Sequence, residues 1–134
     1  MHSTKIVTSF LSHGDKILIL KRSQNVKTMR GIWAGISGII EGNEEPLYRA
    51  KTEIFEEVGV MEDNLVFIKS APKMHVNSPQ YTNHEWIIFP FLFSVKEPKL
   101  KLNWENSEFK WIERNEISKY QIVPNLDKVL ASLL

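Results

Sequence analysis

Residues 38–60 read GIIEGNEEPLYRAKTEIFEEVGV, and this stretch puts three glutamates on one side of a predicted helix. Glu53, Glu56 and Glu57 are three and four residues apart, so at about 100° per residue they share roughly a quarter turn or slightly more. Like charges at this spacing destabilise a helix by about 0.2–0.5 kcal/mol per pair. We therefore expect a positive group to offset them, and Mg²⁺ or Mn²⁺ would suit because both prefer oxygen ligands.

The rest of the stretch predicts an amphipathic helix with defined ends. Its apolar residues recur at spacings of three and four on the opposite flank, and they are Leu47, Ala50, Ile54 and Val58. Gly42 or Asn43 is predicted to cap the start, with Pro46 in the first turn, and Gly59 is predicted to end the helix. A solvated acidic face is the alternative reading of the three glutamates.

This segment resembles the Nudix box, whose pattern is Gly, five residues, Glu, seven residues, then Arg-Glu-apolar-any-Glu-Glu-any-Gly-apolar. The matching positions are Gly38, Glu44, Glu53, Ile54, Glu56, Glu57, Gly59 and Val60. Where the family has arginine, this chain has Thr52. KILILKRS and GIWAGISGIIEG before the box, and SEFKWIERNEI after it, extend the resemblance over roughly residues 3–118.

Length and composition predict one domain, residues 1–134, with 25% charged and 43% apolar residues. Because no apolar run approaches the roughly 20 residues that cross a bilayer, and no signal sequence is evident, we expect a cytoplasmic protein. The absence of cysteine excludes disulfides, thiol catalysis and Cys-ligated zinc. A net charge of +1 gives no strong electrostatic reason to expect a duplex nucleic acid partner.

The order of predicted elements indicates an α+β fold. The predicted strands are 6–12, 16–22, 33–40, 65–76, 82–95 and 109–113. A hairpin turn is predicted at Gly14, and a second turn at Asn77, Ser78 and Pro79. Pro90 predicts an edge strand or a bulge, and residues 124–134 a terminal amphipathic helix. By resemblance this is the Nudix fold, a mixed β-sheet between α-helices.

The resemblance implies an enzyme that hydrolyses a diphosphate linkage in a nucleoside di- or triphosphate or a nucleoside diphosphate derivative. Water attacks phosphorus, and divalent ions gather the polyanion, neutralise developing charge and activate the water. The implied ligands of Mg²⁺ or Mn²⁺ are Glu53, Glu56, Glu57 and the carbonyl of Gly38. The general base stays open between Glu53 or Glu57 in the box and Glu105 or Glu108 later in the chain. Plain surface charge is the alternative for the two later glutamates.

Two arginines are the candidate substrate-binding residues. Arg22 lies at the end of a predicted strand, where Nudix proteins often place a basic residue near the substrate phosphates. Arg49 lies four residues before Glu53 and could also supply the positive charge that is missing at Thr52. The alternative is a solvated pair with Glu45 or Glu53, worth only a few tenths of a kcal/mol.

Other functions and the exact substrate stay open at this point. Thr52 would suit a nucleotide-binding Nudix domain without activity, and RNA 5′-end pyrophosphate removal would need a basic channel. Nudix subfamilies that act on ADP-ribose typically have a proline in the region where this chain has Met74 and His75. Subfamilies that act on dinucleoside polyphosphates typically have a tyrosine after the box, and Tyr81 of this chain lies too far along the sequence to match it. A nucleoside triphosphate or modified nucleotide is therefore favoured by elimination. The resemblance also allows a homodimer.

Overall fold

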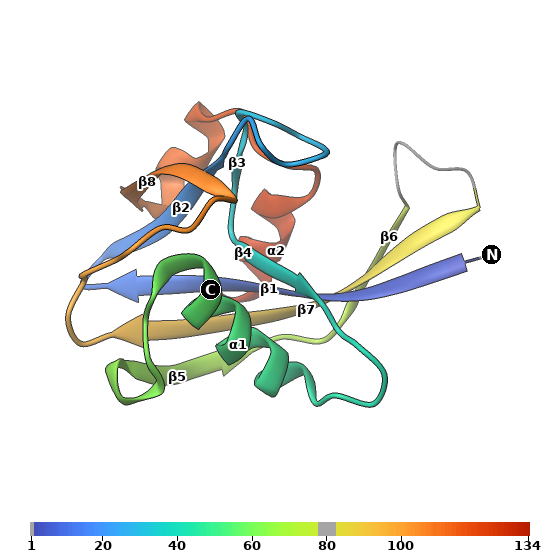
Figure 1. Cartoon of the computed structure of the whole chain (residues 1–134), viewed down its shortest axis with the longest axis horizontal. Coiled ribbons are helices and arrows are strands. Elements are labelled where there is room, and N and C mark those ends of the chain that lie inside the picture. Colours follow the sequence, from blue (N-terminus) through green and yellow to red (C-terminus); the bar gives the residue numbers. More distant parts are fainter. Residues whose placement is uncertain (1, 78–82) are drawn as a thin grey trace.

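The fold, seen in a computed structural model that describes residues 2–77 and 83–134, is a mixed β-sheet with one helix on each face (Figure 1). In chain order the elements are β1 (His2–His13), β2 (Lys16–Arg22), β3 (Trp33–Ala34), β4 (Ile36–Ile39), α1 (Pro46–Val58), η1 (Glu62–Asn64), β5 (Leu65–Ser70), β6 (Met74–Asn77), β7 (His84–Val95), β8 (Asn106–Glu113), η2 (Arg114–Lys119) and α2 (Leu126–Ser132). The predicted α+β class, a mixed β-sheet between α-helices, is confirmed.

The long strands β1 and β7 run parallel at the centre of the sheet, with Ile6 opposite Ile88 and Phe10 opposite Leu92. The strand order is β3-β2-β1-β7-β5, and β4, β6 and β8 pair with β1, β7 and β2 respectively. All of these other pairings are antiparallel. β1 and β2 form the predicted hairpin, in which Gly14 takes a left-handed φ of 59°.

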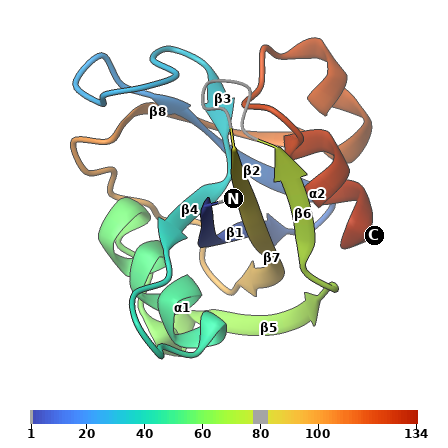
Figure 2. The same ribbon diagram turned by 90° about the vertical axis from the view of Figure 1, so that its right-hand side faces the viewer.

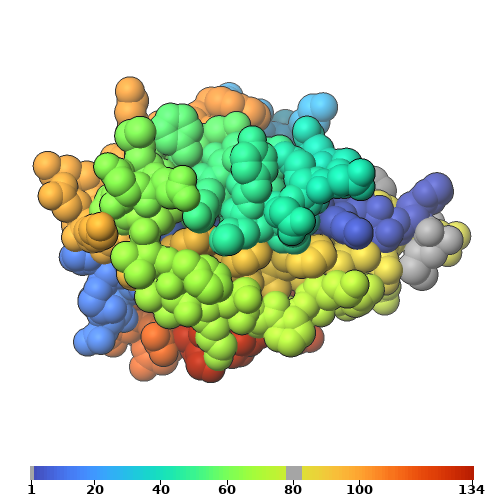
Figure 3. Space-filling model, turned by 90° about the horizontal axis from the view of Figure 1, so that it is seen from below, coloured from blue at the N-terminus to red at the C-terminus, as the bar shows by residue number. Residues whose placement is uncertain are grey.

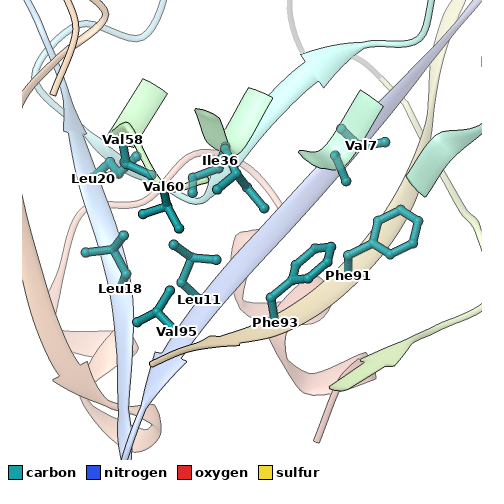
Figure 4. Packing of buried hydrophobic residues seen from close by; sticks show 12 residues of the cluster. Val7, Leu11, Leu18, Leu20, Ile36, Val58, Val60, Phe91, Phe93 and Val95 are labelled. Carbon is teal, nitrogen blue, oxygen red and sulfur yellow. The ribbon is translucent and has the colours of Figure 1, made fainter. Parts of the chain in front are cut away.

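Side chains that alternate along the strands build two separate cores, because successive residues of a strand point to opposite faces of the sheet. On one face, Val7 and Leu11 of β1 pack with Ala50, Ile54 and Val58 of α1. Figure 4 shows this cluster from close by. On the other face, the buried residues include Phe10, Ile17, Ile19, Leu126, Val129 and Leu130. Figure 2 shows α1 and α2 on opposite sides of the strands.

Three expectations about local structure are wrong. The start of α1 is not capped by Gly42 or Asn43, since the N-cap is Glu45 and it makes no side-chain capping bond. Leu47 is 38% exposed, so it does not belong to the packed flank of the helix. The single strand predicted over residues 65–76 is two strands, β5 and β6, which both pair with β7.

Pro90 lies in β7, which is central, so the edge-strand alternative is wrong, whereas a break in the ladder on one side of β7 agrees with the predicted irregularity. The proline is tolerated because it lies between the residues of β7 that pair with β5 and those that pair with β6. The antiparallel ladder is interrupted at this point. Of the second predicted turn, Asn77 ends β6, whereas Ser78 and Pro79 lie outside the described residues. Tyr81 also lies outside them.

Large exposed hydrophobic side chains gather on the outer side of α1 and along β5. They are Leu47, Tyr48, Phe55, Met61, Val66, Phe67 and Ile68. Figure 3 shows that these two segments lie side by side on the surface of the molecule. No helix in the described part of the chain is long and apolar enough to span a membrane.

Candidate active site

Helix α1 carries the three box glutamates, but it does not expose them equally. Its packed side is fixed by Ala50, Ile54 and Val58, each fully buried. Glu53 is 9% exposed and Glu57 is 4% exposed, because both lie toward the sheet, whereas Glu56 is exposed to solvent. A solvated acidic face therefore does not describe this helix, which turns two carboxylates toward the protein interior.

The helix ends as predicted, at Gly59. This residue has a left-handed φ of 70°, and its N–H donates to the carbonyl of Phe55 at 3.0 Å. A glycine adopts this conformation without the steric cost that a Cβ would add. The chain then turns at the end of α1, immediately after Glu57 and Val58.

Gly38 of β4 leaves the space that the Glu53 side chain occupies. Gly38 lies opposite Val7 of β1 in the sheet, and β4 runs beside α1 (Figure 1). A methyl group at position 38 would overlap the side chain of Glu53, with its carbon only 2.7 Å from Oε2. The first glycine of the box is thus required for close approach between strand and carboxylate, although its φ is unexceptional.

Glu57 is a buried carboxylate with one oxygen left unpaired. Its Oε1 accepts a hydrogen bond from Nδ2 of Asn106 at 3.2 Å, and Asn106 is itself 7% exposed. Its Oε2 is buried and has no hydrogen-bond partner among the described residues. Burial raises the pKa of Glu57 well above its ordinary value, and the nearby Glu105 and Glu53 raise this pKa further. A buried, unpartnered carboxylate oxygen is costly for folding and points to a role in binding.

Glu53 is held by Arg49, which also binds Glu44. The Arg49 Nη1 donates to Glu53 Oε2 at 2.9 Å, and its Nη2 and Nε donate to the two oxygens of Glu44 at 2.6 and 3.1 Å. Burial raises the pKa of Glu53, with Glu56 and Glu105 adding to the effect, while Arg49 opposes it. The predicted alternative for Arg49, a solvated pair, is wrong, because the arginine side chain is only 13% exposed.

Glu105 approaches the box glutamates from the loop before β8. Glu105 directly precedes Asn106, which donates to Glu57, and the charge of Glu105 raises the pKa of both Glu53 and Glu57. The Glu105 main chain is fixed by Asn103 Oδ1, which accepts its N–H at 3.0 Å, and by the N–H of Ser23, which donates to its carbonyl at 2.8 Å. Glu108, in contrast, is exposed and forms an ion pair with Lys21 at 3.3 Å.

Arg22 ends β2 at the same side of the sheet, directly opposite Asn106 of β8. Its Nε and Nη2 both donate to the carbonyl of Thr28, at 3.2 and 3.0 Å. Arg22 therefore braces the loop between β2 and β3, which carries the further basic residues Lys27 and Arg30. The predicted contact of Arg22 with substrate stays a prediction.

Sequence reasoning missed Asn106 and the loop contacts that hold it beside α1. Asn103 N–H donates to the carbonyl of Glu57 at 3.3 Å, and Ser23 Oγ donates to the carbonyl of Trp104 at 2.7 Å. The only available signal was the position of Asn106 next to Glu105 and before FKWIE. Its contact with Glu57 depends on the register of β8, which the sequence pattern does not define.

The oxygen-rich composition of this site fits a hard divalent cation. The carboxylates of Glu53 and Glu57, the accessible Glu56 and the carbonyl of Gly38 are ligand types that Mg²⁺ and Mn²⁺ prefer, and Glu57 Oε2 lacks a partner. Within residues 2–77 and 83–134, no group of three or more Asp, Glu or His side chains is arranged to hold a metal ion.

Comparison with known proteins is consistent with this geometry. A family model described as the NUDIX domain matches residues 3–133. The MutT protein of Methanosarcina mazei Go1 is similar in structure, with 20% identity, a TM-score of 0.77, and coverage of 97% of this chain and 91% of that chain. A C. elegans Ap4A hydrolase is similar in structure, with 14% identity, a TM-score of 0.72, and coverage of 98% of this chain and 94% of that chain.

A MutT NUDIX hydrolase from Burkholderia pseudomallei is also similar in structure, with 12% identity, a TM-score of 0.77, and coverage of 100% of this chain and 100% of that chain. At these identities the likeness shows the fold, whereas the family model spans nearly the whole chain. Nudix hydrolases act on small nucleotide substrates and generally use divalent metal ions. The chain belongs to the NUDIX domain family and is a Nudix pyrophosphohydrolase.

Proposed function

We propose that this protein hydrolyses a diphosphate linkage in a nucleoside di- or triphosphate or a nucleoside diphosphate derivative, and that it requires Mg²⁺ or Mn²⁺. The observation that carries the proposal is Glu57, a buried carboxylate whose Oε2 has no partner in the described residues. It lies near Glu53 and Glu105, whose charges raise its pKa further. A folded protein tolerates such a cluster at a cost, and a bound cation would offset the repulsion.

The residues proposed to hold the metal are Glu53, Glu56, Glu57 and the carbonyl of Gly38. When bound, a divalent ion supplies charge neutralisation on the phosphate oxygens and a more acidic water. The protein's own contribution is to fix the carboxylates, through Asn106 on Glu57 and Arg49 on Glu53, and to exclude bulk water from the buried side of α1. Arg22 is proposed to bind the substrate phosphates, whereas the guanidinium of Arg49 is engaged by Glu44 and Glu53.

The proposed general base is Glu53, Glu57 or Glu105. Burial raises the pKa of Glu53 and of Glu57, and the charge of Glu105 adds to both shifts, so the three carboxylates interact electrostatically. Glu108 is the weakest of the predicted candidates, because its exposed carboxylate pairs with Lys21. Separate glutamine variants at these four positions would identify the base from the pH dependence of kcat.

Three further proposals rest on the sequence. We infer that residues 1–134 form a single Nudix domain, a prediction to which the match over residues 3–133 lends support. We also propose a cytoplasmic location, and a homodimer from the family resemblance. Within nucleotide substrates, elimination favours a nucleoside triphosphate or a modified nucleotide.

The proposed function is tested by phosphate release from a panel of nucleoside triphosphates, sugar nucleotides, dinucleotides and 5′-triphosphorylated RNA. The reactions contain Mg²⁺, Mn²⁺ or excess chelator, and pyrophosphatase and phosphatase convert the products to free phosphate. We expect turnover of a free nucleotide class that stops in chelator. Turnover that persists in chelator, or silence across the whole panel, would contradict the proposal, and a preference for RNA would correct its substrate class.

A further inference from the structure

We propose that Arg49 is a positioning residue that holds the Glu53 carboxylate in the site and replaces the arginine that this box lacks at position 52. The catalytic meaning of this inference rests on the proposed function. The geometric part stands on its own, because it concerns where the Glu53 side chain lies when Arg49 is present or absent.

The guanidinium of Arg49 joins two glutamates that lie on either side of it in the sequence. It contacts both oxygens of Glu44, at 2.6 and 3.1 Å, and Oε2 of Glu53 at 2.9 Å. The side chains of Arg49, Glu44 and Glu53 are 13%, 20% and 11% exposed, so this is a partly buried network rather than a fully solvated pair. A planar guanidinium can bind two carboxylates at fixed angles, which a lysine ammonium cannot do in the same way.

Glu44 is itself anchored, so the network has a fixed end. Its Oε1 accepts the N–H of Glu41 at 2.8 Å, in the turn that leads into α1. Glu44 therefore ties Arg49 to the loop after β4, and Arg49 in turn ties Glu53 to that loop. The box glutamate at position 44 acts on the site through Arg49.

Glu53 needs such a partner because its surroundings otherwise disfavour a charged carboxylate. It is 9% exposed, lies against Gly38, and is repelled by the nearby Glu56 and Glu105. A buried carboxylate that loses its only cation is strongly destabilised, and it would turn toward solvent. Arg49 opposes this movement through its 2.9 Å hydrogen bond to Glu53 Oε2.

Position 52 faces a different part of the surface. Thr52 Oγ1 donates to the carbonyl of Tyr48 at 2.9 Å, one turn earlier in the same helix. Its side chain lines a surface groove together with Tyr48, Phe55 and Met61, on the flank of α1 away from Gly38. The cation on this flank, Lys51, pairs with Glu62. It is the Arg49 side chain that reaches both Glu44 and Glu53.

The test compares Arg49→Met, Arg49→Lys and the matched control Lys51→Met. Lys51 pairs with Glu62 at 2.8 Å on the exposed side of the same helix, so its loss should not affect the site. We expect crystal structures of the metal-free Arg49 variants to show the Glu53 carboxylate displaced from Gly38. We also expect Mn²⁺ affinity, measured by electron paramagnetic resonance, to fall about tenfold or more in both, as for other residues that orient metal ligands.

The sign of the change in Mn²⁺ affinity separates positioning from simple charge. If Arg49 only neutralised Glu53, then Arg49→Met would tighten Mn²⁺ binding by removing a competing cation, and Arg49→Lys would leave it unchanged. Either result, or an undisplaced Glu53 in both metal-free variants, would overturn the proposal. Thr52→Arg should change Mn²⁺ affinity less than about twofold, and a clear gain would overturn the claim that Arg49 already fills this role.

These outcomes are distinct from failure of the proposed function. A wild-type protein that hydrolyses nothing would remove the catalytic meaning of the network. The metal-free crystal structures would still decide whether Arg49 positions Glu53.

Discussion

The two helices bury different kinds of side chain against the same sheet. The buried side of α2 is entirely apolar and includes Leu126, Val129 and Leu130. The buried side of α1 contains Ala50, Ile54 and Val58 but also the carboxylates of Glu53 and Glu57. Both helices are amphipathic, yet only α2 is arranged for stability alone. The comparison teaches that the cost of burying charge is confined to the face where the chemistry is proposed to occur.

This contrast implies that the two faces of the sheet should respond differently to substitution. Changes on the α1 face should affect activity more than stability, whereas changes on the α2 face should do the reverse.

Glu57→Gln and Glu56→Gln should each lower kcat by about 10³-fold, on the order of 4 kcal/mol of transition-state stabilisation, while the protein stays folded. Each change removes a charge proposed to bind the metal and leaves the shape of the side chain nearly intact. Steady-state kinetics and circular dichroism measure the two effects. Near-normal rates in both variants would refute the assigned metal site.

Leu130→Ala should cost about 2–5 kcal/mol of the free energy of unfolding, because it opens a cavity under a side chain that is 2% exposed. The kcat per folded molecule should not change. Urea unfolding together with activity at a temperature where the variant remains folded measures both. A variant that is stable but catalytically impaired would break the proposed separation of the two faces.

Gly38→Ala should reduce kcat and cost about 1–3 kcal/mol of stability, because the added methyl overlaps the Glu53 side chain. Gly42→Ala is the matched control, since a Cβ at that position meets no atom within 4 Å and only the left-handed φ of 56° is strained. The control should lose about 1 kcal/mol and keep its activity. Equal activity losses in the two variants would argue against a specific contact with Glu53.

The smallest expected effect is a pH dependence of stability in the metal-free protein. Burial raises the pKa of Glu57, so the folded state holds this proton more tightly than the unfolded state. Stability should therefore fall as pH rises from the ordinary glutamate pKa through the raised pKa, and Glu57→Gln should remove this part of the fall.

Thermal unfolding in chelator between pH 4 and pH 8 measures this effect, with roughly 4 °C expected for each kcal/mol in a domain of this size. Glu56→Gln is the control, because that side chain is exposed. If Glu57→Gln unfolded at a lower temperature than wild type at pH 8, the buried charge would not be a source of instability.

Much of this architecture follows from local pattern. The spacing of Ala50, Ile54 and Val58 predicts the packed side of α1, and Gly59 predicts its end, because both depend on residues close in the sequence. The box also implies that Gly38, Glu53 and Glu57 are neighbours. The close fit of Gly38 against the Glu53 side chain agrees with this for Gly38 and Glu53. Helix periodicity alone does not reveal that Glu53 and Glu57 are buried, since polar residues are expected to face solvent.

The missing parts depend on contacts between distant segments. Asn106 meets Glu57 because β8 pairs with β2 in one particular register, and Pro90 is tolerated because β5 and β6 leave a gap along β7. Spacing along the helix does not choose between Glu45 and Glu53 as the partner of Arg49, and it does not point to Glu44. The turn before α1 folds Glu44 back onto Arg49, which a straight helical projection does not describe.

The central claim is that the buried carboxylates of α1 bind a divalent cation, and Mn²⁺ titration followed by electron paramagnetic resonance tests it most directly. The wild-type protein is compared with Glu57→Gln and with Glu108→Gln, whose carboxylate pairs with Lys21 at the surface. We predict saturable Mn²⁺ binding in wild type and Glu108→Gln, and a loss of about tenfold or more in affinity in Glu57→Gln. Equal Mn²⁺ affinity in all three proteins would contradict the account.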